Sequence, residues 1–311
     1  MTTISDISQQ ALMLGSLDQL KNQATTLQGQ ISSGLKSQDI SGLGLDAGRV
    51  ANLQGAVQHG QAYLDTITTV QQRIQESTDV LTNIQSAVQK FQELLPNGAY
   101  GASPNSIQSQ AQQLLGVVGD LLNTQDGNGY LFSGSLTSTP SFDPSGLPNP
   151  GSLSTSVGGA PPTGYYAGNS TVATARVDDN MTVSYGITAN NPAIENVVRT
   201  LNFIANLPAG SPDPSNATDV ANVNQAADLL NQAVQGLQGL QGGLAMQSSS
   251  LQQVQQNQQD FINLAQGSIT NLESIDPATA ITQLNQVETN LQASYATISG
   301  IQQLSLVNFL K

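Results

Sequence analysis

Apolar residues recur at alternating steps of four and three along two long stretches of the chain. One series is Tyr63, Ile67, Val70, Ile74, Ser77, Leu81, Ile84, Val88, Phe91 and Leu95, and a second with the same spacing runs from Val220 to Leu272. This heptad spacing gathers apolar side chains on one side of a helix. The pattern therefore predicts two long helices, and each must bury its apolar stripe against other helices.

Shorter stripes with the same spacing lie near both ends of the chain. The N-terminal stripe is Leu17, Leu20, Ala24, Leu27 and Ile31, and the C-terminal one is Leu284, Val287, Leu291, Tyr295, Ile298 and Ile301. Gly34 is expected to end the first of these helices, since glycine is the usual residue just past a helix end. Asp276 before Pro277 predicts the start of the last helix, and the pairs Ser103-Pro104 and Asn191-Pro192 predict two further starts.

The middle of the chain has a different composition. No glutamine occurs between Gln125 and Gln225, although glutamine is abundant on both sides, and residues 138–164 are rich in Pro, Gly and Ser. Residues 170–187 alternate in polarity about an Asp-Asp-Asn turn, which predicts a β-hairpin. The segment as a whole is expected to be a surface elaboration of a helical protein.

Together these patterns predict a mainly α fold. We expect a long antiparallel helical rod, a coiled-coil-like bundle built from the N- and C-terminal arms, with a small β-containing insert. The predicted domains are terminal helices (1–45 and 276–311), a helical rod (46–127 and 191–275) and an outer insert (128–190).

Composition excludes several classes of protein. Charged residues make up 9% of the chain, and the net charge is −13 with a pI near 4.1. A nucleic-acid-binding protein needs clustered basic side chains, and so does a protein that adheres to an anionic membrane surface. No apolar run approaches the ~20 residues of a membrane span. We therefore expect neither nucleic acid nor membrane as a partner.

Residues that could carry chemistry are sparse. The chain has no cysteine and a single histidine, His59, which lies on a predicted helix and is expected to face solvent. Asp178 and Asp179 are explained by the hairpin turn rather than by a metal. The glycines in GLGLDAG (residues 42–48) follow no strand, so a phosphate-binding loop is not supported. We expect no enzyme activity, no metal and no cofactor.

The arrangement of amphipathic termini around a variable insert resembles the flagellin superfamily. ISSGLKSQDISGLG (residues 31–44) is similar to the end of that family's first helix. GYLFSGSLTSTPSF (129–142) and LQASYATISGIQQLSLVNFL (291–310) resemble the FlgL-type hook-associated proteins, which form the hook-filament junction, more than bulk flagellins. Residues 164–201 resemble an insert shared by these proteins, and the resemblance is least in residues 143–162.

This resemblance implies a structural role in the bacterial flagellum. Family members leave the cell unfolded through the flagellar type III export apparatus, and the N-terminus has no basic, apolar pattern of a cleaved signal peptide. The expected location is therefore the extracellular flagellum. The implied partners are neighbouring subunits, another hook-associated protein, flagellin and an export chaperone.

The residues expected to carry assembly lie on the terminal stripes. They are Leu17, Leu20, Leu27, Ile31, Leu291, Tyr295, Ile298, Leu304, Leu306 and Phe309. The resemblance also implies that an export chaperone binds Leu291, Ile298, Ile301 and Leu304. Two alternatives remain at this point: the chain could be flagellin itself, the bulk filament subunit, or a cytoplasmic coiled-coil adaptor with no flagellar role.

Overall fold

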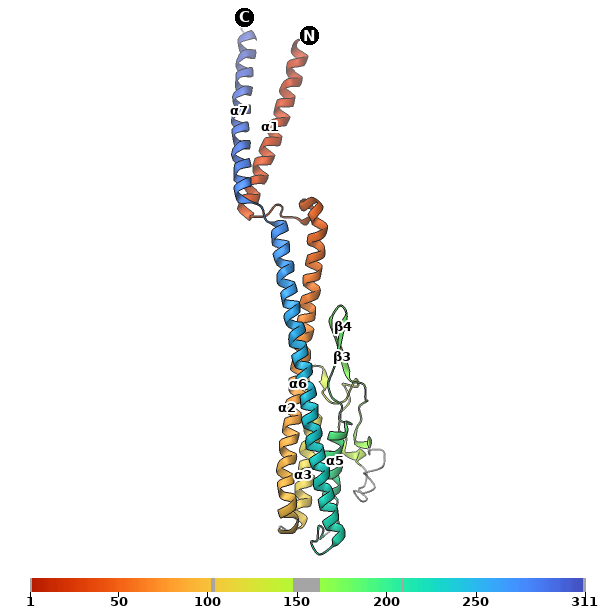
Figure 1. Cartoon of the computed structure of the whole chain (residues 1–311). Helices are drawn as coiled ribbons and strands as arrows, with labels where there is room; N and C mark the ends of the chain where they lie inside the picture. Colours follow the sequence, from red (N-terminus) through yellow and green to blue (C-terminus); the bar gives the residue numbers. More distant parts are fainter. Residues whose placement is uncertain (1, 102–103, 148–162, 209, 310–311) are drawn as a thin grey trace. The chain divides into compact units, whose positions relative to one another are not determined.

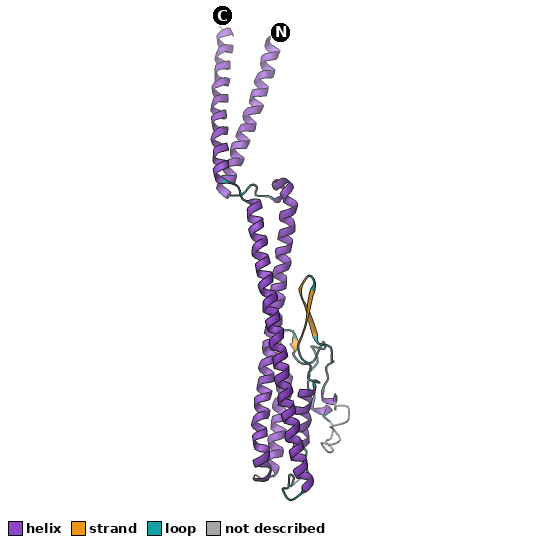
Figure 2. Ribbon diagram, viewed as in Figure 1, coloured by secondary structure: helices purple, strands orange, loops and turns teal. Residues whose placement is uncertain are grey.

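A computed structural model describes the backbone of residues 2–101, 104–147, 163–208 and 210–309, and the side chains of 11–95, 106–147, 164–208 and 210–300. The chain divides into two compact units, which we call unit 1 (1–59 and 260–311) and unit 2 (60–259). The elements in chain order are α1 (Thr2–Ser33), η1 (Ile40–Asp46), α2 (Ala47–Gly101), α3 (Pro104–Leu122), β1 (Gln125–Asp126), β2 (Gly129–Tyr130), η2 (Pro144–Gly146), η3 (Thr163–Tyr165), β3 (Ala173–Asp178), β4 (Met181–Tyr185), α5 (Pro192–Ala205), α6 (Ala217–Glu273) and α7 (Pro277–Phe309). Figure 1 and Figure 2 show these elements.

The predicted mainly α fold with a small antiparallel β insert is confirmed. Helix ends follow the local signals in the sequence. Gly34 has a φ of 73°, a conformation that glycine adopts readily, and α1 ends immediately before it. The Asn191 side chain accepts a hydrogen bond from Ala193 N at the start of α5. Asp276 Oδ1 accepts one from Ala278 N, 3.0 Å away, at the start of α7.

Helices α2 and α6 run antiparallel through unit 2. Gln92 Nε2 donates to Asn231 Oδ1 at 3.1 Å, and Gln241 Nε2 donates to Thr82 Oγ1 at 3.3 Å. Ten residues back along α2 correspond to ten residues forward along α6, as expected for antiparallel helices in one register. Every residue of the first predicted stripe from Ile67 to Leu95 is buried. The heptad stripe is therefore the packing seam of α2.

Helices α3 and α5 pack against each other and complete the helical part of unit 2. Their buried residues join those of α2 and α6 in one apolar core. Members from these four helices include Leu81, Leu95, Ile107, Leu122, Ile194, Leu201, Leu230 and Leu237. Four helices thus share one core, although α2 and α6 lie far apart in sequence.

Two small antiparallel hairpins lie beside the helices of unit 2 (Figure 2). The β3–β4 hairpin lies within the insert, and the β1–β2 hairpin spans its start. Strands β3 and β4 pair with Ala173 opposite Tyr185, and a bulge lies between Arg176 and Asp178. Val177 is buried in the core, while Met181 and Val183 pack against its edge. The predicted hairpin and its apolar face are therefore present in the structure.

The insert also contributes to the core, which corrects the expectation of a surface elaboration. Phe132 and Tyr165 are buried completely or almost completely, and Phe142 is 5% exposed. The Phe142 and Tyr165 rings lie 5.7 Å apart between centroids. Because these aromatic residues come from segments rich in Gly, Ser and Pro, their local pattern contains no strand or helix signal.

In unit 1, α1 and α7 pack against each other in an antiparallel pair. The segments that precede α7 and follow α1 are joined by backbone hydrogen bonds, with Ile275 N donating to Gly34 O at 3.0 Å. Lys36 Nζ donates to Leu272 O at 2.7 Å. A lysine on the last carbonyls of α6 is favourable because helix C-termini carry partial negative charge.

Candidate assembly surface and insert anchor

The terminal stripes meet along α1 and α7. Ala24 and Leu27 of α1 and Val287 of α7 form a buried apolar cluster, with Leu20, Leu284 and Leu291 packed around it. Antiparallel helices pack in this way when each presents apolar residues at three- and four-residue steps. The structure therefore brings the N- and C-terminal stripes together, as the spacing indicates.

The residues predicted for assembly differ in how far this pairing covers them. Leu17 and Leu27 are 5% and 6% exposed, and Leu20, Ile31, Leu291 and Ile298 are partly buried. Tyr295 is 49% exposed, and Lys21 Nζ lies 5.9 Å from the centroid of its ring. The α1–α7 pair thus uses one side of the stripes and leaves Tyr295 at its margin.

The last predicted residues lie where the structure describes only the backbone. Helix α7 continues to Phe309, but the side chains of Ile301, Leu304, Leu306 and Phe309 lie outside the described residues. Their roles in assembly and in chaperone binding stay predictions.

Unit 1 exposes large apolar side chains on several elements. Among the described residues these are Leu12, Leu14, Ile40, Leu45, Phe261, Leu264, Ile281 and Tyr295. Leu45 is 100% exposed and Leu264 70%. Most of the large hydrophobic side chains that the described part of the chain exposes belong to unit 1. Groups of exposed apolar residues are typical of surfaces that become buried by association.

The sequence patterns did not indicate several of these exposed residues. Ile40 and Leu45 lie in η1 within ISGLGLD, and Phe261 and Leu264 lie on α6 beside its seam residues Ile262 and Ala265. Heptad periodicity identifies the side of a helix that is buried by its partner. It does not identify apolar residues outside that side. Such residues are recognised only when the structure shows which positions the partner helix leaves exposed.

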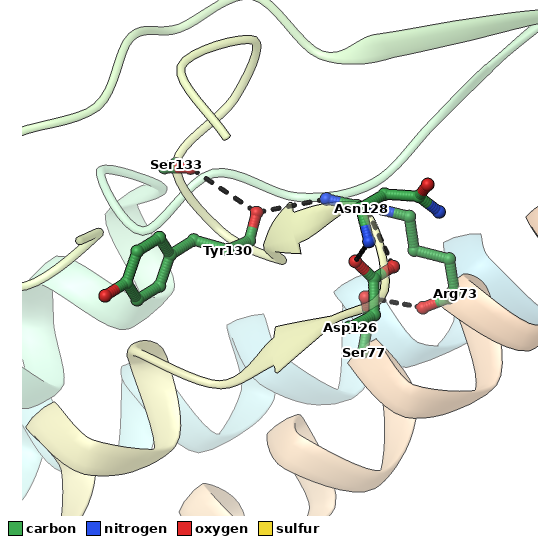
Figure 3. Close-up of polar contacts among 6 residues, drawn as sticks. All are labelled: Arg73, Ser77, Asp126, Asn128, Tyr130 and Ser133. Atoms are coloured by element: carbon green, nitrogen blue, oxygen red, sulfur yellow. Dashed lines mark hydrogen bonds and ion pairs between the residues drawn. The ribbon is translucent and has the colours of Figure 1, made fainter. Parts of the chain in front are cut away.

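A buried ion pair anchors the β1–β2 hairpin, at the start of the insert, to α2 (Figure 3). Arg73 Nη1 donates to Asp126 Oδ2 at 2.7 Å, and Nη2 donates to Tyr130 O at 3.0 Å. The two side chains are 7% and 10% exposed. One guanidinium thus contacts both strands of the β1–β2 hairpin.

The turn between these strands is arranged around the same carboxylate. Asn128 N donates to Asp126 Oδ1 at 2.7 Å, so both carboxylate oxygens accept hydrogen bonds. Ser77 Oγ donates to Arg73 O at 2.8 Å, which satisfies a polar residue inside the apolar seam. Burial of both charges is favourable only when hydrogen bonds of this quality compensate for lost hydration. The anchor therefore fixes the position of the insert on α2.

A second buried ion pair lies within α5, where the Arg199 guanidinium bonds Glu195 across one helical turn. Tyr165 lies in the same environment and donates from its hydroxyl to Ala189 O at 2.9 Å. Burial raises the pKa of Tyr165 well above its ordinary value, and the negative charge of Glu195 raises it further. Burial also raises the pKa of Tyr166 to about 12.

Unit 2 is expected to lose stability in alkaline solution because Tyr165 must stay protonated when folded. Tyrosine in an unfolded chain ionises near pH ~10, whereas the pKa of folded Tyr165 is raised. Between these pKa values the unfolded state binds fewer protons, so the free energy of unfolding falls as pH rises. The slope for this group is about 1.4 kcal/mol per pH unit. Urea unfolding at pH 8 to 11 measures it.

Tyr165→Phe is the control for this prediction. The variant leaves Ala189 O without its donor and costs about 1 kcal/mol at neutral pH. Its stability then falls less steeply above pH ~10 than that of the wild type. Equal slopes in the two proteins would show that Tyr165 is not the titrating group.

The residues considered for chemistry lie on α2 and at the tip of the β3–β4 hairpin. His59 is exposed on α2, and in the described part of the chain no three His, Cys, Asp or Glu residues lie close enough to hold a metal ion. Asp178 and Asp179 accept hydrogen bonds from Gln258 and Tyr63. Among the described helices, none combines the length and apolar character of a membrane span.

Comparison with known proteins gives matches in structure. The sequence matches no family model and finds no significant match among curated proteins. The crystal structure of Bacillus cereus FlgL aligns with 71% of this chain and 99% of its own, at 15% identity and a TM-score of 0.44. A Vibrio parahaemolyticus protein designated a flagellar hook-associated protein aligns with 76% of this chain and 99% of its own, at 14% identity and a TM-score of 0.59. This chain therefore shares its fold with that Vibrio parahaemolyticus protein.

Proposed function

We propose that this chain is a structural subunit of the bacterial flagellum that joins the hook to the filament. The observation that carries the proposal is the apolar surface that unit 1 exposes around the paired terminal helices. The fold shared with a protein designated hook-associated supports a flagellar setting, and the sequence resemblance supports the junction rather than the filament.

Assembly in this proposal proceeds through unit 1. Its exposed apolar residues lie on α1, η1, α6 and α7, so several elements supply apolar side chains for contacts with neighbouring subunits. Contacts between different surfaces of neighbouring subunits are head-to-tail, and such contacts generate rings or helical assemblies. In this proposal residues 1–45 and 276–311 are the inner assembly domain, residues 46–127 and 191–275 the helical rod and residues 128–190 the outer insert. The exposed Phe261 and Leu264 then extend the assembly surface from the inner domain onto the end of the rod that belongs to unit 1.

Low charge suits an assembly of identical subunits. Only 9% of the residues are charged, so neighbouring copies present amide and hydroxyl surfaces with little like-charge repulsion. Export before assembly requires a chain that folds afterwards, and a sequence without cysteine forms no disulfide on the way out. An export chaperone and another hook-associated protein are the remaining proposed partners.

Immunogold labelling of intact flagella tests the proposal. An antibody raised against residues 163–190 of the insert is expected to label one narrow band at the end of the hook. Label along the whole filament would identify the bulk filament subunit instead. Protein confined to cells, with no label on flagella, would contradict both flagellar roles and favour the cytoplasmic adaptor.

A further inference from the structure

The tip of the β3–β4 hairpin contacts two helices that are distant in sequence. Tyr63 Oη, on α2, donates to Asp179 Oδ1 at 2.8 Å, and Gln258 Nε2, on α6, donates to Asp178 Oδ2 at 2.6 Å. The hydrogen bond to Asp179 is also the main cause that raises the pKa of Tyr63. Two adjacent carboxylates therefore connect α2 to α6 through the hairpin.

Hydrogen bonds within the turn also position these two aspartates, independently of the helices. Arg176 Nε donates to Asp178 O at 3.2 Å, and Arg176 Nη2 donates to Asp179 O at 2.5 Å. Asn180 N donates to Asp178 Oδ1 at 3.3 Å. The bulge between Arg176 and Asp178 shifts the register just before the turn. These local bonds depend on neither helix and fix the shape of the tip by themselves.

The base of the hairpin is attached elsewhere in the insert. Asn190 Nδ2 donates to Ser170 Oγ at 2.9 Å, and Ala189 N donates to Phe132 O at 2.9 Å. Gly186, which follows β4 directly, has a φ of 96° that other residues rarely adopt. The β3–β4 hairpin is therefore attached at two places: its base is bonded to other parts of the insert, and its tip is bonded to α2 and α6.

The hairpin has fewer buried contacts than the core beneath it, although Gln258, one of its two helix partners, is buried. Val177 is fully buried, but the other residues of β3 and β4 are partly or fully exposed. A two-stranded hairpin is marginally stable by itself, and Tyr63 and Asp179 meet where water has access. Regions with few buried contacts open at lower free energy than the global unfolding transition.

We propose that the tip of this hairpin is a releasable latch that fastens α2 to α6. The contacts lie at Tyr63 and Gln258, which are near the positions in both helices where unit 2 ends. When the latch is closed, it opposes separation of the helices at this end of the unit. When it opens, β3 and β4 detach while the core around Leu81 and Leu237 stays packed. This latch is independent of the proposed flagellar function.

Removal of both helix donors tests the latch without changing the hairpin. The variant Tyr63→Phe/Gln258→Leu keeps apolar volume but removes the hydroxyl and amide that bind the tip. Trypsin cleavage after Arg176 then reports on opening, because a protease cuts a paired strand only when it is locally released. We expect the rate of this cleavage in the full chain, measured by mass spectrometry, to rise roughly tenfold from the loss of two hydrogen bonds.

Gln253→Leu is the matched control, since Gln253 is exposed on α6 and donates its side-chain hydrogen bond to nearby Asn257. This variant should leave cleavage after Arg176 unchanged. Cleavage after Lys90, which requires opening of α2 in the helical core, should also stay unchanged in the double variant. Equal cleavage after Arg176 in wild type and double variant would overturn the latch. A parallel rise at Arg176 and Lys90 would also overturn it, because unit 2 would then be opening as a whole.

Discussion

Asp126→Ala is expected to destabilise unit 2 by about 3–5 kcal/mol, because it leaves a buried guanidinium without its counter-charge. Arg73 is 7% exposed on its side chain, and its remaining partner is the carbonyl of Tyr130. The substitution also removes the acceptor of Asn128 N in the turn. Urea unfolding of the full chain measures the loss. Helical circular dichroism reports the transition in which unit 2 unfolds.

The double variant Arg73→Met/Asp126→Leu separates the unpaired charge from the lost contact. Exchange of a buried ion pair for apolar residues of similar volume is often neutral or stabilising. We therefore expect the double variant to be more stable than Asp126→Ala. A cost below about 1 kcal/mol for Asp126→Ala, the range of an exposed pair, would contradict the anchor. So would a double variant as unstable as the single one.

The helical part of this fold follows from the sequence because its signals are local. The stripe from Ile67 to Leu95 repeats at helical spacing, and each position is buried in the structure. Gly34 and Asp276 mark helix ends through backbone conformation and capping, which depend on neighbouring residues only. The same holds for the hairpin, whose alternation and turn lie within residues 170–187.

The anchor and the latch could not be predicted in this way, because their partners are distant in sequence. Arg73 and Asp126 are 53 positions apart, and Gln258 and Asp178 are 80 apart. One signal was nevertheless available for the anchor. Arg73 is one of only eight basic residues and directly precedes Ile74 of the seam, where a charge requires a partner. Which acidic residue supplies it is decided by the fold of the insert.

Tyr165 shows a different limit of the sequence pattern. The segment around it contains Pro and Gly and has no period, so it reads as a surface loop. Tyr165 is nonetheless only 1% exposed, and its hydroxyl donates a hydrogen bond to Ala189 O. An aromatic side chain supplies a large apolar area and can enter a core from irregular backbone, provided that its hydroxyl finds an acceptor. Sequence periodicity detects helices and strands. The burial of a single aromatic residue such as Tyr165 depends on tertiary structure and has no periodic signal.

Leu27→Asp is expected to prevent filament attachment while unit 2 stays folded. Leu27 is 6% exposed in the apolar cluster with Ala24 and Val287. An unpaired carboxylate at this position opposes α1–α7 pairing, because burial removes its hydration. Every subunit carries the substitution, so we expect almost no cells with attached filaments. Electron microscopy of a strain that carries only this variant measures the effect.

Gln28→Asp is the matched control, since it places the same charge on the adjacent, exposed position of α1. It should leave attachment near the wild-type level. In both variants the free energy of unfolding of unit 2 should stay within about 0.5 kcal/mol of the wild type, because neither residue belongs to its core. Normal filaments in the Leu27→Asp strain would show that the α1–α7 seam does not carry assembly. An equal defect in Gln28→Asp would indicate a general sensitivity to charge at the N-terminus, whereas a defect confined to Leu27→Asp would locate assembly on the paired terminal helices.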